Sequence, residues 1–152
     1  MDRWSTSVGR ELRHLTRQEC VTLLASASIG RVAFCTPTGP MVLPVNYAMH
    51  DGGPLFRTSS HGSLAERLRD NTAVALEVDD VDERTRSGWS VVVRGHASVV
   101  ESSRLPTTTD GRPRPWAGGA RMLHIRISPT EITGRRLEPS PDLSGGRSWM
   151  RT

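Results

Sequence analysis

The chain has 152 residues, of which 36% are hydrophobic and 24% charged, and its formal net charge is +4. This length is typical of one domain and is sufficient to bury a substantial core. All 20 basic residues are arginine, and they are spread from Arg3 to Arg151 rather than gathered in one segment. The charge therefore does not indicate a nucleic-acid-binding protein.

No apolar stretch is long enough to span a membrane, and the first residues lack the hydrophobic region of a secretory signal. The spacing of Cys20 and Cys35 matches neither a redox pair nor a zinc module. Both cysteines fall in apolar segments and are predicted to be buried. We therefore expect a cytoplasmic protein without a membrane partner.

Residues 1–14 are polar and are predicted to be flexible. Thr16 and Glu19 have the spacing of a capping box, in which a hydroxyl and a carboxylate accept hydrogen bonds from the first N–H groups of a helix. Apolar residues follow at helical spacing, and Gly30 stands where a C-cap is expected. The pattern predicts a helix over residues 17–28.

Beyond this helix the hydrophobic period changes to that of strands. Segments 31–36, 41–49 and 55–59 are rich in apolar residues and are separated by turns that contain Pro or Gly, which predicts a β-meander. Pro44 lies inside the second segment. Because proline cannot donate to a ladder, it indicates an edge, a bulge, or backbone that faces something other than a strand.

A second capping box is predicted at Ser63 and Glu66, where it would open a short helix. Strands are predicted at 72–79 and 89–101, with a charged loop between them. Gly95 inside the later strand indicates a bulge or a close approach of two backbones.

Residues 102–120 form a long loop rich in Pro, Gly, Ser and Thr, and loops of this length are usually functional or disordered. Residues 121–128 alternate strictly between apolar and polar side chains until Pro129 ends the pattern. A last strand is predicted over 131–137, and the tail 138–152 is predicted to be disordered.

The strands and turns predict a mainly β domain over residues 15–137, with two or three short helices. Most of the predicted strands are joined by short turns, whereas a doubly wound parallel sheet needs long crossovers. The order of elements therefore favours an antiparallel barrel.

The strongest candidate site is the corner at Arg57, Thr58, Ser59, Gly62 and Ser63, where a predicted strand leads through a polar loop into a helix. Helix N-termini present unsatisfied N–H groups that suit a phosphate, and a guanidinium and hydroxyls lie beside this one in sequence. An ordinary strand–helix connection explains the same residues, so the corner alone leaves both interpretations open.

Two further stretches are candidates for contact with a planar ring. Pro44 interrupts the strand next to Val45, Asn46 and Tyr47, so nearby N–H groups are candidates for hydrogen bonds to such a ring. A plain edge strand is the alternative there. Trp89 stands at the head of a strand and suits stacking on a ring or packing in a dimer interface, with a core aromatic as the alternative.

Other catalytic patterns are missing from the sequence. It contains no G-x-S-x-G elbow, and its five histidines show no paired metal spacing. The acidic run 79–83 lacks the spacing of a calcium loop and is interpreted as a solvated turn. We expect no metal site, and the sequence identifies no catalytic side chain.

Taken in order, several motifs resemble the pyridoxamine 5′-phosphate oxidase-like superfamily of FMN-binding split barrels, over roughly residues 14–137. The resemblance is closest to small members of the actinobacterial type, and it implies an antiparallel split β-barrel with a flavin in a groove between the two subunits of a homodimer. The motifs are Leu15–Leu24 leading into Ile29–Ala33, Pro44–Tyr47, Phe56–Thr58 with Gly62–Ser63, Ala75–Asp80, Gly88–Gly95, His124–Ile127 and Ile132–Arg136.

The same resemblance implies a position for each candidate residue around the cofactor. The backbone of Val45, Asn46 and Tyr47 would lie along the isoalloxazine ring. Arg57, Thr58 and Ser59 would line the ribityl and phosphate side, and Gly62 and Ser63 would meet the phosphate. Trp89 and Ser90 would come from the other subunit, and Trp116 in the long loop would cover the cofactor.

One position departs from the family pattern. Members commonly carry Lys after the Gly-Ser pair, and this chain has Leu64 there. Loss of a charge-assisted phosphate contact costs on the order of 1.5–3 kcal/mol, which Arg57 or Arg67 is placed to offset. FMN is the expected cofactor, with a deazaflavin or an empty site as alternatives.

The resemblance implies an FMN-dependent oxidoreductase that acts on an unknown small molecule, because the flavin itself supplies the redox chemistry. Oxidation of pyridoxamine phosphate is not expected, since the substrate-binding Arg and His pattern of the true oxidases is not evident near the C-terminus. The alternatives are a non-catalytic sensor or carrier that binds a flavin, a deazaflavin or haem, and a partner-binding barrel without a cofactor.

Overall fold

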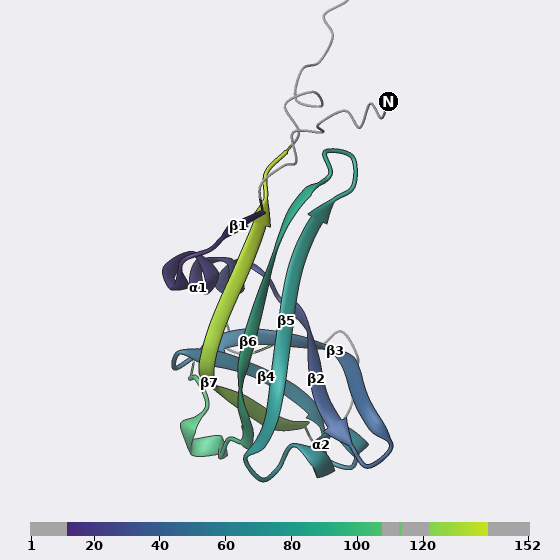
Figure 1. The fold of residues 1–152 in the computed structure, drawn as a ribbon. Coiled ribbons are helices and arrows are strands. Elements are labelled where there is room, and N and C mark those ends of the chain that lie inside the picture. The colour runs from purple at the N-terminus through teal and green to yellow at the C-terminus, as the bar shows by residue number, and fades with distance from the viewer. Residues whose placement is uncertain (1–11, 108–112, 114–121, 140–152) are drawn as a thin grey trace, which may run out of the picture.

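The computed structural model describes residues 12–107, 113 and 122–139, whose arrangement is shown in Figure 1. The described part of the chain is mainly β, with two short α-helices. In chain order its elements are β1 (Leu12–His14), α1 (Arg17–Ser26), β2 (Ile29–Thr36), β3 (Gly39–His50), β4 (Gly53–Ser59), α2 (Ser63–Arg67), β5 (Thr72–Asp82), β6 (Ser87–Val99), the 3-10 helix η1 (Ser102–Arg104) and β7 (Met122–Leu137).

The strands form one antiparallel barrel. They pair in the order β1-β7-β4-β3-β2-β5-β6, and β6 pairs again with β7. This last pairing closes the ring, because each strand from β2 to β7 then has a neighbour on both sides. Every pairing is antiparallel. The predicted fold, an antiparallel split β-barrel with short helices, is confirmed.

The barrel carries an extension, which we call the arm. It consists of residues 79–90 of the β5–β6 hairpin, residues 135–137 of β7, and β1. Figure 1 shows the hairpin and the end of β7 rising beyond the body of the barrel. Backbone N–H groups of Arg84 and Thr85 donate to the Asp82 carboxylate at 2.9 and 3.2 Å, and the bonds from Thr85 are the main reason why the pKa of Asp82 is lowered. The hairpin turn is therefore held by a charged side chain.

The core fills the barrel with alternate side chains of its strands. Phe56, Leu76 and Ile125 are fully buried on three strands, and α1 adds Cys20 and Leu24. Burial raises the pKa of the Cys20 thiol. Among the described residues no polar or charged one is buried, so apolar burial is the main stabilising contribution.

The prediction that both cysteines are buried is wrong for Cys35. Cys35 is exposed, whereas its neighbour Phe34 is only 4% exposed. Successive strand residues face opposite sides of a sheet, so the apolar run around Cys35 contains one outward position.

The first capping box is confirmed. The N–H of Glu19 donates to Thr16 Oγ1 at 3.2 Å, and Glu19 Oε2 accepts from the Thr16 N–H at 2.7 Å. The helix ends at Ser26, two residues earlier than predicted, and its C-cap is Ala27 rather than Gly30. Gly30 lies in β2 instead, where a Cβ would come within 3.0 Å of Glu77 O on β5. Close packing of two strands explains this glycine.

The bulge predicted at Gly95 is confirmed, and it explains why β7 continues through Pro129. The register of β6 and β7 shifts between Arg94 and Gly95, which are paired with Glu131 and Pro129. Thr130 is the extra residue, and its hydroxyl donates to Arg94 O at 3.1 Å. A proline is tolerated at such a position because it interrupts no ladder bond. The two strands predicted on either side of it are therefore one strand.

Two boundaries differ from the sequence-based segmentation. Residues 12–14, expected within a flexible segment, pair with residues 135–137 of β7, and residues 1–11 lie outside the described residues. Residues 138–139 are exposed beyond β7, and the rest of the predicted tail is not described. None of the described helices has the length and apolar character needed to cross a membrane.

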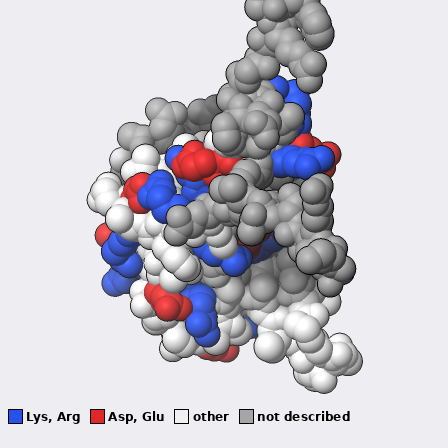
Figure 2. Space-filling view, turned by 45° about the horizontal axis from the view of Figure 1, so that its top comes forward, with Lys and Arg blue, Asp and Glu red and all other residues white. Residues whose placement is uncertain are grey.

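Arginines and acidic residues are interspersed on the described surface in view in Figure 2. Several form ion pairs, including Arg31 with Glu77 at 3.1 Å and with Asp79 at 2.9 Å. Contacts between exposed charges of this kind contribute at most about 1 kcal/mol each. The main effect of these ion pairs is that several surface arginines have a carboxylate beside them.

Candidate functional site

Arg57 lies directly opposite His124 on the β4–β7 ladder. Phe56, which precedes Arg57 on β4, and Ile125, which follows His124 on β7, are fully buried in the core. Since successive strand residues face opposite sides, Arg57 and His124 both face the outside of the barrel. The pairing of β3 with β4 ends at Tyr47 and Phe56. Asn46 and Arg57 are the next residues on the two strands, so Asn46 lies alongside Arg57. We call Asn46, Arg57 and His124 the polar row.

Arg57 carries an unusual feature. Its Nε is buried and has no hydrogen-bond partner, and no other side-chain atom in the described part of the chain shares this state. A buried donor left unpaired costs about 1–3 kcal/mol, and more when it carries charge. Such a group indicates a missing acceptor, and the strongest acceptors for a guanidinium are carboxylate and phosphate oxygens.

The corner that follows β4 brings Thr58, Ser59, Gly62 and Ser63 close in sequence to Arg57, but the predicted second capping box is wrong. Gly62 is the N-cap of α2, and no side chain caps it. Ser63 is the first helical residue and is exposed. A helix of only five residues has a weak dipole, so any anion affinity of this corner depends on its side chains.

The corner is nevertheless an ordered turn. The N–H of Gly62 donates to Ser59 O at 3.2 Å, and Arg69 donates to Ser60 O at 3.1 Å. Ser60 Oγ and His61 Nδ1 lie 3.0 Å apart. These bonds place the exposed Ser59 two residues from Arg57, on the same face of β4.

The segment at Val45, Asn46 and Tyr47 is split between the core and the surface. Val45 and Tyr47 are 8% and 2% exposed and belong to the core, so only Asn46 faces outward. The Tyr47 hydroxyl donates to Leu24 O at 2.6 Å, and its N–H donates to Ser28 O at 2.9 Å. The Tyr47 N–H, one of those considered for a ring, is therefore occupied, and burial raises the pKa of Tyr47 above its usual range.

Pro44 lies in the part of β3 that is paired with β2 but not with β4. It is paired with Arg31 on β2, whereas the pairing of β3 with β4 begins only at Tyr47. Within the described residues, positions 39–45 thus have no strand on one side, as expected from an internal proline.

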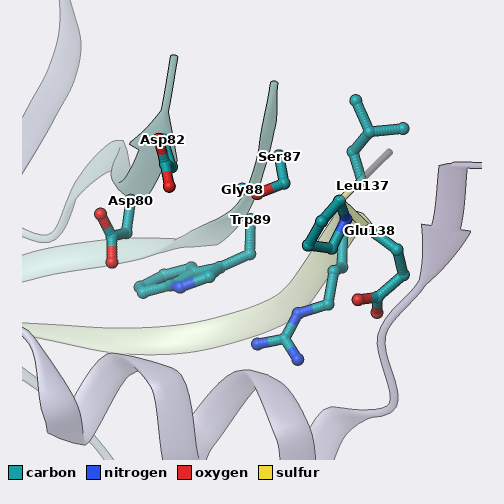
Figure 3. A pocket seen from close by; sticks show the side chains of 9 residues that line it. Asp80, Asp82, Ser87, Gly88, Trp89, Leu137 and Glu138 are labelled. Carbon is teal, nitrogen blue, oxygen red and sulfur yellow. The ribbon is translucent and has the colours of Figure 1, made fainter. Parts of the chain in front are cut away.

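Trp89 and Ser90 point to opposite faces of the arm, because they are adjacent on β6. Trp89 is paired with Asp80 and Arg136 and packs against the core. Figure 3 shows the Trp89 ring beside Asp80, in a hollow of about 210 Å³. This hollow is lined by Asp80, Asp82, Ser87, Gly88, Trp89, Arg136, Leu137, Glu138 and Pro139.

Ser90 lies on the outer face of the arm. Its cross-strand neighbours there are Asp79 and Arg135. A second hollow, of about 410 Å³, has Ser90, Arg135, Leu12 and Val81 among its lining residues. Neither hollow is lined by a residue of the polar row, so within one chain the structure does not bring the two groups of predicted site residues together.

Comparison with known proteins shows which family the chain belongs to. The family model described as pyridoxamine 5′-phosphate oxidase matches residues 16–136. This chain belongs to that family. It is 35% identical to the uncharacterized protein Rv0080 of Mycobacterium tuberculosis over 139 residues, which cover 89% of this chain and 91% of that protein. The resemblance predicted from the motifs is confirmed.

Solved structures support the same relationship for this oxidase-family member. The FAD-binding protein from Mycobacterium smegmatis superposes with a TM-score of 0.71 at 31% identity, over 83% of this chain and all of the other. An FAD-binding protein from Mesorhizobium loti gives a TM-score of 0.67 at 27% identity, over 84% and 99% of the two chains. Both matches cover nearly all of the other chain and more than four fifths of this one.

The structure gives Leu64 of this family member a place in the core. Its side chain is 8% exposed and packs with Leu68 and other core residues. The position therefore does not face an anion bound beside Arg57, and a lysine there would bury an ammonium group at considerable cost. The leucine at this position therefore serves the packing of the core.

His124 was missed by sequence reasoning as a site residue. Its signal was present in the strict alternation of the last strand, which places His124 and Arg126 on one face. What the pattern lacked was the partner strand, since only the β4–β7 register brings His124 opposite Arg57. Trp116, predicted as a cover, lies outside the described residues. The described residues contain no group of three metal-ligating side chains.

Proposed function

We propose that this member of the pyridoxamine 5′-phosphate oxidase family binds a flavin nucleotide, with a phosphate group seated on the polar row. The observation that carries the proposal is the buried, unpartnered Nε of Arg57. A guanidinium in this state fits a phosphate, which accepts two parallel hydrogen bonds from it. Ser59 supplies a hydroxyl on the same face and Asn46 supplies an amide, whereas Thr58, which was predicted beside them, lies between Arg57 and Ser59 on β4 and faces the other side.

The nature of the ligand is supported by relatives. The similar structures from M. smegmatis and M. loti are named as FAD-binding proteins, and the motifs of this chain favour FMN. Both nucleotides share the isoalloxazine ring, the ribityl chain and the first phosphate. The proposal concerns this shared part, and the experiment below separates the two.

The unpaired edge of β3 fits the ring. Asn46 connects this edge to the polar row, so a ligand whose phosphate lies on Arg57 can direct its ring along residues 39–45. Backbone N–H and C=O groups of such an edge suit the polar rim of a flavin. Pro44 has no N–H to donate, so this edge is poorly suited to pairing with another strand, and a ring is the better fit.

The site requires two copies of the chain if Ser90 also meets the flavin. Ser90 is paired with Arg135, and Arg57 with His124, so the two positions lie eleven residues apart along β7. At about 3.3 Å per residue this corresponds to roughly 35 Å measured along β7, which bends at the bulge on the way (Figure 1). We propose a two-fold dimer in which the arm of one copy lies beside the polar row of the other.

Exposed apolar side chains on β2, β3 and the arm support a homodimer. Ile29, Met41 and Val42 are 37%, 39% and 58% exposed, and on the arm Leu12 and Val81 are 47% and 63% exposed. Ile29, Val42 and Val81 lie on the outer face by strand alternation. We propose that Ile29, Val42 and Val81 lie in the interface between the two copies, since apolar side chains that gather in a patch mark such interfaces. Burial of this face in a homodimer would also exclude water from the bound flavin.

The proposed activity is that of a flavin-dependent oxidoreductase. The flavin supplies the redox chemistry when bound, and the chain contributes binding, orientation and the exclusion of water. Arg57 would hold the phosphate, and the β3 edge would orient the ring. No side chain of the chain need act as an acid or base, because the flavin itself supplies the redox chemistry.

The test is a titration of the purified, flavin-free protein with FMN, FAD and a deazaflavin, followed by flavin fluorescence. Saturable binding of FMN or FAD supports the proposal, and the tighter of the two identifies the cofactor. Anaerobic addition of NADH or NADPH then tests the activity, since bleaching of the bound flavin is expected of an oxidoreductase. Flavin that binds but is reduced by neither donor favours a carrier or sensor. Failure of all three ligands to bind contradicts the proposal.

A further inference from the structure

His124 adds a second nitrogen-bearing side chain to the proposed phosphate site. Directly paired residues of an antiparallel ladder have Cα atoms about 5 Å apart, and their side chains share one face. His124 and Arg57 stand in this relation, and both are partly buried. An imidazole is the side chain whose charge ordinarily changes near pH 6.5.

We infer that protonated His124 is a second phosphate ligand beside Arg57, so that this protein binds phosphorylated flavins more tightly in mildly acidic solution. The inference deepens the proposed function and rests on it. Arg57 supplies a charge that is present at every relevant pH, and His124 supplies one that is present only after proton uptake. The polar row is therefore a phosphate site with one permanent and one titrating cation.

The charged groups around His124 determine the direction of the effect. On β4 the facing charge is Arg57, and on β7 itself Arg126 lies two residues away on the same face. The Val100 N–H donates to His124 O at 2.8 Å, and the exposed Glu101 follows it in the chain. Arg126 is held elsewhere, since it donates to the carbonyl oxygens of His50 and Asp51.

The charged residue paired with His124 across the ladder is Arg57, and its guanidinium opposes a second positive charge at this point. A phosphate between the two removes this opposition, because its negative charge attracts both cations. Binding of the flavin and binding of the proton then favour each other by the same factor. The sign follows directly: affinity rises as pH falls through the imidazole range and levels off once His124 is charged in the free protein.

The experiment compares the affinity for FAD at about pH 8 and about pH 5.5, at constant ionic strength. FAD is the probe because its diphosphate does not titrate in this range, whereas the phosphate of FMN takes up a proton near pH 6. We expect FAD to bind about tenfold more tightly at the lower pH, as one added charge-assisted contact implies. Riboflavin, which lacks phosphate, is expected to show no such change.

Three variants assign the effect to His124. His124→Gln is expected to bind FAD at both pH values with the weaker affinity, and His124→Lys at both with the stronger one. The matched control is His61→Gln, because His61 is the exposed histidine of the neighbouring corner and bonds to Ser60. This control is expected to keep the full dependence on pH. The lysine variant shows by its own binding that a change at position 124 leaves the fold intact.

Several results would overturn the inference. One is an FAD affinity that is independent of pH in the natural protein, and another is an undiminished dependence in His124→Gln. An equal dependence for riboflavin would show that the proton does not act on the phosphate. Absence of flavin binding at every pH contradicts the proposed function itself, which distinguishes that failure from a failure of the histidine alone.

Discussion

Arg57 and His124 face each other across β4 and β7, although β5 and β6 lie between them in the sequence. Their pairing places two nitrogen-rich side chains at one point on the outside of the barrel. The buried Nε of Arg57 finds no acceptor there. Two nitrogen-bearing side chains with an unpaired donor between them suit an anionic ligand.

Removal of the Arg57 side chain tests that role. Arg57→Ala is expected to weaken binding of FMN and FAD at least about tenfold, because a charge-assisted phosphate contact is lost. The affinity for riboflavin is expected to stay the same, since no phosphate is involved. Fluorescence titration measures all three. Arg17→Ala, on the exposed surface of α1, is the control and should leave every affinity unchanged.

The single tyrosine of the chain offers a direct test of the core. Tyr47 is the only tyrosine, and its hydroxyl donates to Leu24 O in a buried position. Burial raises its pKa, so the folded state keeps the proton that the unfolded chain releases near pH 10. Phenolate absorbance is expected to stay absent above that pH until the protein unfolds. Stability contributed by Tyr47 is present below about pH 10 and is lost as the pH rises further. Ordinary titration of the folded protein near pH 10 would contradict the burial.

The same hydrogen bond is expected to contribute to stability. Tyr47→Phe keeps the packing of the ring but leaves the Leu24 carbonyl without its donor. An unpaired buried acceptor costs about 1–3 kcal/mol. Urea denaturation should show a loss of this size in the free energy of unfolding. An unchanged midpoint and slope would show that the bond contributes nothing.

The bulge between β6 and β7 makes Gly95 hard to replace. A Cβ at Gly95 would lie 2.1 Å from Ser128 O, which requires the backbone to move. We expect Gly95→Ala to lower the free energy of unfolding by about 1–3 kcal/mol. Gly62→Ala is the matched control, since its Cβ would meet nothing closer than Ser59 O at 3.6 Å. Equal stability of the two variants would refute the close approach at the bulge.

The proposed homodimer is tested on its exposed apolar face. Val42→Asp replaces a side chain that is 58% exposed, so the fold of one chain should tolerate it. We expect the variant to sediment as a monomer and to lose flavin affinity together with the dimer. Gln18→Asp, on the exposed side of α1, serves as the control. A monomeric variant that binds flavin with undiminished affinity would argue against a shared site.

Much of the fold is predictable from local patterns. The capping box at Thr16, the alternation of the strands and the glycine at the bulge all act over a few residues, and the structure confirms each. The errors also have local causes. Pro129 was interpreted as a strand end because the bulge that accommodates it depends on β6. Ser63 was interpreted as a cap because its spacing to Glu66 suits one, whereas Gly62 holds that position.

The site was less predictable, because it depends on which strands are neighbours. Arg57 stood out in the sequence by its polar surroundings, but the register that pairs it with His124 is a long-range property. The same limit applies to Leu64, whose burial in the core is likewise a tertiary property. Trp89 and Ser90 are neighbours in sequence whose side chains leave opposite faces of β6, and both nevertheless line the second hollow.

The most direct test of the shared flavin site mixes two variants that each fail alone. Arg57→Ala removes the phosphate contact, and Ser90→Trp fills the outer face of the arm without touching the core. Each is expected to bind FAD poorly as a homodimer. After both are unfolded and refolded together, half of the dimers are mixed, and each mixed dimer regains one of its two sites, so about a quarter of all sites should bind FAD with natural affinity. Flavin titration of the mixture measures this fraction. Recovery of about a quarter of the sites supports a site built from the polar row of one chain and the arm of its partner, and no recovery would contradict it.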